Sequence, residues 1–255
     1  MSAPPRRRRR RMLLLAAGAV PLAGAQAPAF AQASWFGRGG RVEGSGKSVD
    51  DERAVAAFTQ VTVDGPLHVR IGAGEVDRVV VRADDNIAPL IETSVRGATL
   101  AIGLKSGAAY RTRTPVQIRV HARQLQGVTL RGSGDIRVDR VEAEVFEATV
   151  QGSGDVAIEA LQAGAVAISI AGNGDLRARG KARTVGLVID GSGDAHCAEL
   201  VATTVAVSIR GSGDARVHAT DALQVSISGS GTVRYRGEPK VTKAISGSGS
   251  VAPLR

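Results

Sequence analysis

The chain has 255 residues, 43% of them hydrophobic and only 3% aromatic, and its formal net charge is +9. Six arginines form one run, Arg6 to Arg11, inside a segment that we predict is removed on export. That segment contains no acidic residue, so the remaining chain carries 9 − 6 = +3. The basic character belongs mainly to the removable segment, and it does not indicate a nucleic-acid-binding protein.

Residues 1–33 have the three parts of a secretory signal peptide. The arginine run precedes an apolar stretch from Met12 to Val20, and two Ala-x-Ala sites follow, ending at Ala27 and Ala33. This order predicts export, and the stretch is shorter than the roughly 20 apolar residues that a membrane span needs. We favour the Sec pathway. Twin-arginine export is the alternative, because Arg10 and Arg11 directly precede the apolar residues.

Residues 34–53 are small, polar and rich in glycine, as in the Glu-Gly-Ser-Gly-Lys segment at 43–47. This composition predicts a flexible leader. We assign residues 54–255 to one domain. They contain no further long apolar stretch, so we expect the mature chain to be soluble or peripherally attached, with no transmembrane segment.

Residues 54–125 alternate apolar and polar side chains between glycine-containing turns, which predicts short strands. We expect them to form irregular coils that close the N-terminal end of the domain. The segment from Ile87 to Val95 could be a short helix or a strand, because Pro89 lies within it. The predicted strands are 61–63, 67–71, 79–81, 99–102 and 116–120.

Residues 126–255 are dominated by a repeat with the sequence Gly-Ser-Gly-Asp or a close variant. The intervals between successive starts are 20, 20, 19, 20, 18 and 18 residues. A constant period near twenty predicts a β-solenoid, in which each coil buries its apolar face only against its neighbours. The repeats start at Gly132, Gly152, Gly172, Gly191, Gly211, Gly229 and Gly247.

Each repeat has one strand of alternating apolar and polar residues before the glycines and a second such strand after them. Alternation places apolar side chains inside the coil and polar ones outside. Cys197, the only cysteine, occupies the inward position that Val138 and Val217 hold in other repeats. We therefore predict a buried and unreactive thiol, and no disulfide can form within the chain.

The glycines flanking each serine or asparagine are predicted to form the tight corner of a coil. At least one should need a positive φ, and a Cβ would meet the identical corner of the next coil. The predicted turn glycines are Gly132, Gly134, Gly152, Gly154, Gly172, Gly174, Gly191, Gly193, Gly211, Gly213, Gly229, Gly231, Gly247 and Gly249.

With these features the chain resembles the auto-transporter adhesin head GIN domain family. Upstream of the array, the resemblance rests on residues 69–71, 79–81, 84–86, 97–102 and 116–125, and the array extends it to about Ser250. The resemblance implies a right-handed parallel β-helix in an exported or envelope protein, chiefly bacterial. It brings no catalytic or ligand-binding residue that could be assigned to this chain.

The fourth position of the repeat should stack as a row of carboxylates, which repel one another unless compensated. We favour compensation by basic residues two positions later, namely Arg137, Arg177, His196, Arg216 and Arg234. A recognition stripe and a weak calcium site remain as alternatives, although calcium takes 6–8 oxygen ligands. The row, which also holds the calcium candidates, consists of Asp135, Asp155, Asp175, Asp194 and Asp214, and in the last two repeats Thr232 and Ser250 replace the aspartate.

These observations favour a non-enzymatic, adhesin-like module of the bacterial envelope that binds an unidentified envelope protein or glycan. The alternative is a periplasmic structural or envelope-stress accessory protein. A polysaccharide-active enzyme is less favoured, because it needs a cleft with clustered carboxylates and aromatic platforms. We expect no catalytic residue, no cofactor and no nucleic-acid partner. We expect a periplasmic location, with the cell surface or secretion as alternatives.

Overall fold

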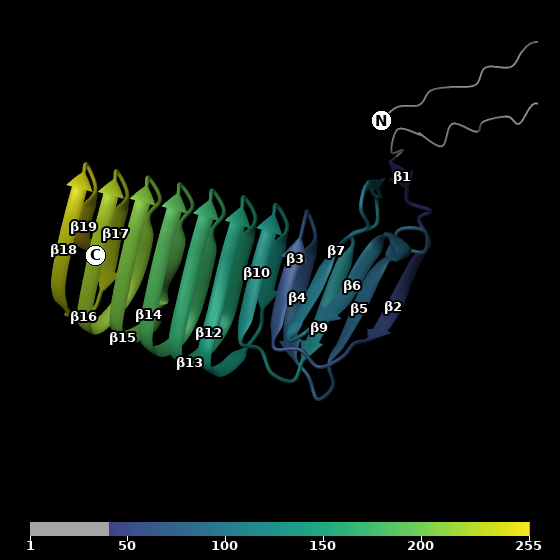
Figure 1. Cartoon of the computed structure of the whole chain (residues 1–255), viewed down its shortest axis with the longest axis horizontal. Helices are drawn as coiled ribbons and strands as arrows, with labels where there is room; N and C mark the ends of the chain where they lie inside the picture. The colour runs from purple at the N-terminus through teal and green to yellow at the C-terminus, as the bar shows by residue number, and fades with distance from the viewer. Residues whose placement is uncertain (1–40, 255) are drawn as a thin grey trace, which may run out of the picture. The chain divides into compact units, whose positions relative to one another are not determined.

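The computed structural model describes residues 41–254, and in this range the regular secondary structure is almost entirely β-strand. Seventeen strands form one continuous hydrogen-bonded system, and β1 pairs separately with β8. The strands wind into a β-solenoid, as predicted (Figure 1). Within the described part of the chain, no helix has the length and hydrophobicity that a membrane crossing requires. The predicted signal peptide and residues 34–40 of the leader lie outside the described residues.

The first strands are short, and the long strands β12 to β16 that follow pass from one side of the solenoid to the other. In chain order they are β1 (Val42–Glu43), β2 (Ser48–Ala54), β3 (Gln60–Asp64), β4 (His68–Ala73), β5 (Arg78–Asp84), the 3₁₀ helix η1 (Ala88–Leu90), β6 (Ile91–Arg96), β7 (Thr99–Leu104), β8 (Tyr110–Arg111), β9 (Gln117–Ala122), β10 (Gly127–Gly132), β11 (Asp135–Val138), β12 (Val141–Gly152), β13 (Asp155–Gly172), β14 (Leu176–Gly191), β15 (Ala195–Gly211), β16 (Ala215–Gly229), β17 (Thr232–Arg236), β18 (Lys240–Gly247) and β19 (Ser250–Pro253).

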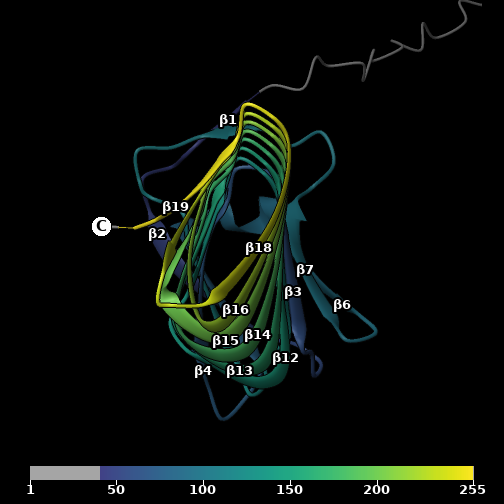
Figure 2. The same ribbon diagram turned by 90° about the vertical axis from the view of Figure 1, so that its left-hand side faces the viewer.

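Successive coils stack in register, so that equivalent positions of the repeat lie above one another. β13 pairs with β14 in parallel, with Ile168 beside Leu187, Ile170 beside Ile189 and Gly172 beside Gly191. Viewed along the axis, the coils superpose as nested, flattened loops (Figure 2). The period of the sequence therefore becomes a translation of about 4.8 Å per coil.

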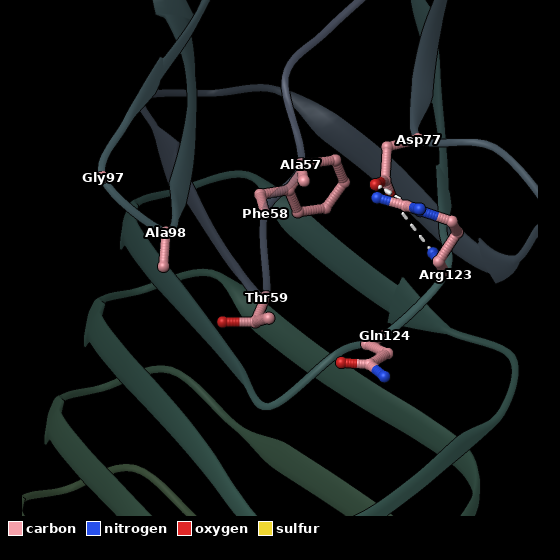
Figure 3. Close-up of a pocket in the computed structure, with 8 residues that line it drawn as sticks. All are labelled: Ala57, Phe58, Thr59, Asp77, Gly97, Ala98, Arg123 and Gln124. Carbon is pink, nitrogen blue, oxygen red and sulfur yellow. Dashed lines mark hydrogen bonds and ion pairs between the residues drawn. The ribbon is translucent and has the colours of Figure 1, made fainter.

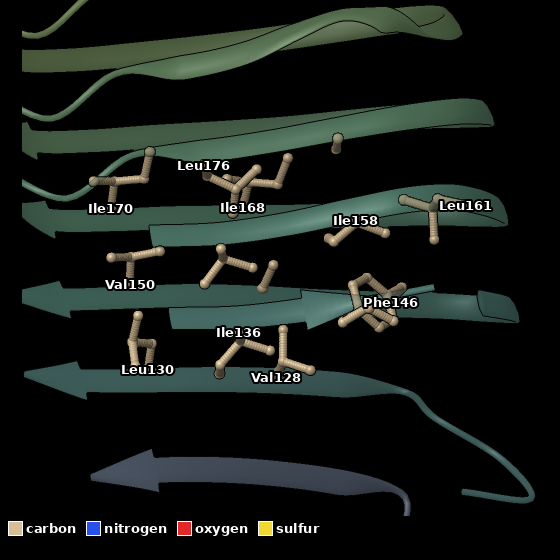
Figure 4. Packing of buried hydrophobic residues seen from close by; sticks show 14 of the residues in the cluster. Val128, Leu130, Ile136, Phe146, Val150, Ile158, Leu161, Ile168, Ile170 and Leu176 are labelled. Atoms are coloured by element: carbon tan, nitrogen blue, oxygen red, sulfur yellow. The ribbon is translucent and has the colours of Figure 1, made fainter. Parts of the chain in front are cut away.

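The apolar members of each strand form columns that fill the space between the two sides of the solenoid (Figure 4). Leu130, Val150, Ile170 and Ile189 form one such column, and each is 0% exposed. Fully burying a side chain of this kind contributes about 1.5–3 kcal/mol. Because each column member touches the coils on both sides, this burial fixes the register as well as the stability.

The N-terminal coils do not follow the order of the sequence. β3 pairs with β7 on one side and with β10 on the other, and β4 lies in the same way between β9 and β11. The coil at residues 60–73 is thus enclosed between coils formed by residues that come after it. The chain passes this coil at residues 123–126, where the Gln126 N–H donates to the Thr59 carbonyl at 2.7 Å. This interleaving was not predicted.

Antiparallel strands cover the N-terminal end of the solenoid. β5 pairs antiparallel with both β9 and β2, and β6 pairs antiparallel with β7. Residues 87–95, for which helix and strand were both considered, contain η1 followed by β6.

Residues 48–53 of the predicted flexible leader instead belong to β2, so the leader does not extend that far. Arg53 helps to hold this segment in place. Its guanidinium donates to the carbonyls of Ile91 at 2.7 Å and Ala88 at 3.0 Å, and it pairs with Asp51 at 2.7 Å. The glycine-rich composition of the leader did not reveal that its last residues complete a sheet.

In the last, C-terminal coil, a lysine replaces an apolar residue in one of the stacked columns. β18 stacks on β16 with Ile245 beside Ile227, but Lys243 takes the place next to Val225. Val225 is 1% exposed, whereas Lys243 lies at the surface of the last coil. The apolar column that contains Val225 therefore ends at this residue, whereas the column that contains Ile227 continues to Ile245.

The two glycines of each corner meet different requirements. The first glycine has φ between +118° and +137° at all seven corners, a region that costs a side chain energy but not glycine. The second glycine lacks a positive φ, yet a Cβ on Gly154 would lie less than 3.0 Å from the Gly134 carbonyl oxygen. That approach is needed because the Gly132 carbonyl accepts hydrogen bonds from both Ser153 N–H (2.9 Å) and Gly154 N–H (3.1 Å).

Replacing Gly154 with alanine should test this packing without a change of φ. We expect Gly154→Ala to lower the free energy of unfolding by about 1–3 kcal/mol, the usual cost of overpacking. Gly186→Ala is the matched control, because a Cβ there meets only the Val166 carbonyl oxygen, at 4.0 Å. The control should be neutral or stabilising by up to about 1 kcal/mol. Urea unfolding followed by circular dichroism measures both, and equal losses would contradict the corner argument.

Cys197 lies inside the solenoid, as predicted, with 2% of its surface exposed. Burial raises the pKa of its thiol to about 12, so the reactive thiolate is scarce at neutral pH. We expect iodoacetamide at pH 8 to leave the folded protein unmodified and to add one label per chain after urea unfolding. Mass spectrometry reads the label. Labelling of the folded protein at the rate of a free cysteine would show that this position opens to solvent.

Candidate functional site

The two outer sides of the solenoid differ in chemistry. One side, which we call the hydroxyl face, has a central row of small polar side chains in register. The row consists of Thr62, Thr129, Thr149, Ser169, Ser208 and Ser226, with the apolar Val188 between Ser169 and Ser208. The other side, which we call the charged face, consists of the outward side chains of β9, β4, β11, the first residues of β13 to β16, and β17. The aspartate row and the basic residues considered above both lie on the charged face.

The aspartate row forms a ladder in which each carboxylate accepts a hydrogen bond from the following coil. Asp175 N–H donates to Asp155 Oδ1 at 3.1 Å, and Asp194 N–H donates to Asp175 Oδ1 at 3.0 Å. Asp214 N–H then donates to Asp194 Oδ1, and Thr232 N–H to Asp214 Oδ1, both at 2.8 Å. An amide dipole thus lies between successive carboxylates and offsets their repulsion, because a hydrogen bond to the charged form stabilises it.

The predicted pairing of this row with the following basic residues is wrong. Within residues 41–254, the only ion pair to the row joins His68 Nδ1 and Asp135 Oδ2 at 2.8 Å. Residues two apart on a strand are separated by about 7 Å, and the hydrogen bond directs each carboxylate along the stacking direction instead. Arg137 reaches forward to Glu159, at 3.3 Å. The sequence pattern located the acids and bases correctly but assigned the wrong partners.

The calcium candidates are the same five aspartates. In the part of the chain that the structure describes, His, Cys, Asp and Glu side chains do not gather in any group of three or more that could hold a metal ion. Each ladder carboxylate already uses Oδ1, which leaves one carboxylate oxygen per coil. Calcium takes 6–8 oxygen ligands, so the ladder by itself is a poor calcium site.

The basic residues form a continuous row of their own across the charged face. In stacking order it consists of Arg119, Arg70, Arg137, Ala157, Arg177, His196, Arg216 and Arg234, with Ala157 as the one member that is not a basic residue. Arg70 pairs with Asp139 at 2.9 Å, and that carboxylate raises the pKa of Arg70. Within residues 41–254, Arg119, Arg177, Arg216 and Arg234 make no ion pair within 4.0 Å.

Ala157 opens a groove in this row. A hollow of about 580 Å³ lies around it, walled by Arg70, Arg119, Arg137 and Arg177 and by carboxylates of the aspartate row. Arg70 and Arg119 were not recognised as members, because the interleaved coils bring them into the row from far upstream. A signal was present, since Val69-Arg70-Ile71 and Ile118-Arg119-Val120 repeat the pattern of Ile136-Arg137-Val138.

A second polar hollow, of about 650 Å³, lies where the described chain begins, between residues 43–46, Asp84 and residues 111–113. Asp84 is 1% exposed, and Thr112 donates its hydroxyl to Oδ2 at 2.6 Å, which holds the pKa of Asp84 below its usual range. Asp84 Oδ1 has no hydrogen-bond partner among residues 41–254. The Asn86 side chain donates to the Glu43 carbonyl at 2.7 Å and holds residue 43 against this cluster. This cluster anchors the segment before β2.

Substitutions at Asp175 distinguish the amide ladder from charge pairing. Asp175→Asn keeps an oxygen acceptor, so we expect the free energy of unfolding to change by less than about 0.5 kcal/mol. Asp175→Ala removes the acceptor and should cost about 0.5–1.5 kcal/mol. Thermal and urea unfolding, with EDTA or low-millimolar calcium, measure both variants. If loss of charge were the cause, asparagine would cost as much as alanine. A large calcium-dependent rise in Tm would instead support a calcium site at the aspartate row.

Comparisons with known proteins agree with this architecture. A comparison with curated protein sequences finds no match. A Bacteroides fragilis protein described as a putative adhesin has a TM-score of 0.80 at 22% identity, covering 84% of this chain and 100% of that one. A putative lipid binding protein from Parabacteroides distasonis has a TM-score of 0.71 at 24% identity, covering 85% and 100%. A putative adhesin from Parabacteroides merdae has a TM-score of 0.69 at 21% identity, covering 84% and 99%.

At these identities the structural neighbours establish the fold alone, and the family assignment comes from the sequence. The family model described as "Putative auto-transporter adhesin, head GIN domain" matches residues 57–239, which is well over half of the chain and includes the interleaved coils as well as most of the glycine array. The resemblance drawn from the sequence is confirmed, and the chain belongs to the head GIN domain family of auto-transporter adhesins.

Proposed function

We propose that this protein is a non-enzymatic, adhesin-like binding module of the bacterial envelope, and that it holds an acidic glycan along the basic row. The observation that carries the proposal is the set of arginines in that row, Arg119, Arg177, Arg216 and Arg234, whose guanidinium groups have no ion-pair partner within residues 41–254. The neighbouring acids already accept hydrogen bonds from the backbone. These guanidinium groups can therefore bind an anion, although the ladder carboxylates beside them keep one oxygen each.

The geometry suits a linear ligand. The row runs along the solenoid axis in steps of about 4.8 Å, and a guanidinium donates to a carboxylate in a planar, two-point arrangement. The aspartate row lies about 7 Å to one side, where repulsion of a ligand charge amounts to about 0.6 kcal/mol in water before screening. A hydrogen bond to a charged group contributes about 1.5–3 kcal/mol, so direct contacts outweigh that repulsion.

The family and the described neighbours support a binding role over catalysis. The family is named for adhesins, and the similar solved structures are described as adhesins or as a lipid-binding protein. The groove at Ala157 is lined by four arginines and two aspartates that lie on strands of a stiff scaffold. Exposed charges of this kind bind weakly one at a time and gain strength by repetition.

Neutralising two arginines of the row should weaken binding to a polyanion. We expect the variant Arg177→Gln/Arg216→Gln to bind immobilised polygalacturonate at least about tenfold more weakly than the natural chain. Raising the salt concentration from about 0.05 M to about 0.3 M should weaken binding by the natural chain, because the charges are exposed. Surface plasmon resonance measures both effects.

The matched control is Arg96→Gln/Arg113→Gln, which removes the same charge from two exposed arginines outside the row. It should bind like the natural chain. An equal loss of affinity in both double variants would show that only net charge matters. If the natural chain bound neutral dextran as tightly as polygalacturonate, the acidic-glycan proposal would be overturned.

We further propose that the module resides in the periplasm. In intact cells of its native host, the mature protein should resist added protease, and permeabilising the outer membrane should make it cleavable. A periplasmic marker and a surface-exposed marker serve as controls in the same samples. Cleavage in intact cells would place the module on the outer surface instead, and recovery from the culture medium would indicate secretion.

A further inference from the structure

A preorganised arginine lies in a hollow at the interleaved coils, away from the basic row. The hollow measures about 470 Å³ and is formed where four separate segments meet: residues 57–59, Asp77, the β6–β7 turn at 97–98, and the crossing segment at 123–124. Figure 3 shows Asp77 and Arg123 on one side and Gly97 and Ala98 on the other. Its size lies within the range of small-ligand sites, about 300–1,000 Å³.

The walls of the hollow are fixed by the backbone. Thr59 N–H donates to the Ala98 carbonyl at 2.9 Å, and Gln126 N–H donates to the Thr59 carbonyl at 2.7 Å. Phe58, which is 3% exposed, packs into the core at this point. The hollow therefore exists because the crossing segment must pass the enclosed coil, and it does not depend on a flexible loop closing.

Asp77 holds Arg123 at two points. The Arg123 backbone N–H donates to Asp77 Oδ1 at 2.9 Å, and Arg123 Nε donates to Asp77 Oδ2 at 2.8 Å. The Asp77 side chain is only 4% exposed, whereas that of Arg123 is 54% exposed. Both oxygens of a buried carboxylate are thus engaged by one residue, which fixes the backbone and the side chain of Arg123 together.

This clamp leaves the outer edge of the guanidinium available. Arginine commonly meets a protein carboxylate through its paired terminal nitrogens, but here the carboxylate takes Nε and the main chain. Within residues 41–254, the hydrogen bonds of the Arg123 guanidinium come from Nε alone, and Nη1 and Nη2 donate none. Their four N–H donors match the two oxygens of a carboxylate or phosphate group. The side chains of Thr59 and Gln124 add neutral polar groups to the same hollow.

The charge balance favours a carboxylate over a phosphate. Asp77 already compensates Arg123, so the site has no excess positive charge for a dianion. A monoanion adds one unit of charge and can be held by charge-assisted hydrogen bonds. Ala57, Phe58 and Ala98 give the hollow an apolar side next to this polar edge.

We propose that Arg123, positioned by Asp77, binds the carboxylate of a small ligand in this hollow. Two sources share that chemistry: a uronic acid unit of a glycan and the free C-terminus of a peptide. The site is separate from the basic row, and loss of binding at either site leaves the other intact. Arg123 is the binding residue, and Asp77 is a positioning residue.

Titration of the ¹⁵N-labelled protein tests the site, because the Arg123 side-chain Nε–H gives its own NMR signal. Galacturonate and N-acetylalanine are the two probes, and galactose and N-acetylalanine amide are their neutral counterparts. We expect saturable shifts of the Arg123 signal with at least one acid and not with its neutral counterpart. A response to galacturonate alone identifies a sugar acid, and a response to N-acetylalanine alone identifies a peptide terminus.

Two variants separate binding from folding. Arg123→Gln removes the guanidinium group and should weaken binding by at least about tenfold. It also leaves Asp77 buried without its partner. Ala98→Trp fills the exposed side of the hollow without touching the ion pair, so it should abolish binding while Tm stays unchanged. Because Arg123→Gln has no Nε–H signal, binding to both variants is read from the backbone amides in the hollow.

Arg113→Gln, at an exposed arginine outside this hollow, is the control for charge and should bind normally. Absence of any shift with both acids would overturn the proposal. Equal shifts with the neutral counterparts, or tighter binding of inorganic phosphate, would also overturn it. The Arg177→Gln/Arg216→Gln variant should bind the small acids normally, so failure of the polygalacturonate experiment does not affect this test.

Discussion

Close contact between identical corners is the constraint on which the rest of this solenoid depends. A corner carbonyl must accept amide hydrogen bonds from the next coil, and this approach leaves no room for a Cβ on the second glycine. The first glycine supplies the positive φ that turns the chain. Once these two positions are fixed, coil spacing and register follow, and each apolar side chain stacks on its equivalent in the next coil. The packing of the corners and the packing of the core therefore depend on each other.

The repeat made the regular half predictable, because a fixed period with two glycines per corner admits few other structures. The N-terminal half was harder, since interleaving depends on contacts such as β3 with β10, which join residues far apart in the sequence. The aspartate partners were missed for another reason. A side chain that accepts a backbone N–H from the next coil leaves no distinctive residue pattern, whereas Arg137 and Arg177 suggested pairing by sequence proximity alone.

Both candidate binding sites arise where the regular pattern is broken. Ala157 replaces an arginine and opens the groove in the basic row. The crossing segment leaves the stacking pattern and creates the hollow at Arg123. A perfectly repeated coil offers the same flat surface at every step, which gives little to distinguish one ligand from another. Departures from the repeat are therefore the places where this scaffold can acquire selectivity without disturbing the core.

The lysine in the last coil has a consequence for behaviour at high concentration. A solenoid end exposes unpaired strand edges, and such an edge is a template on which further chains can add. Here the position beside Val225 is taken by Lys243, so a chain docking on this end would have to bury an ammonium group against an apolar column, at a cost of several kcal/mol. Lys243 thus makes the stacking of a further chain on this end of the solenoid unfavourable.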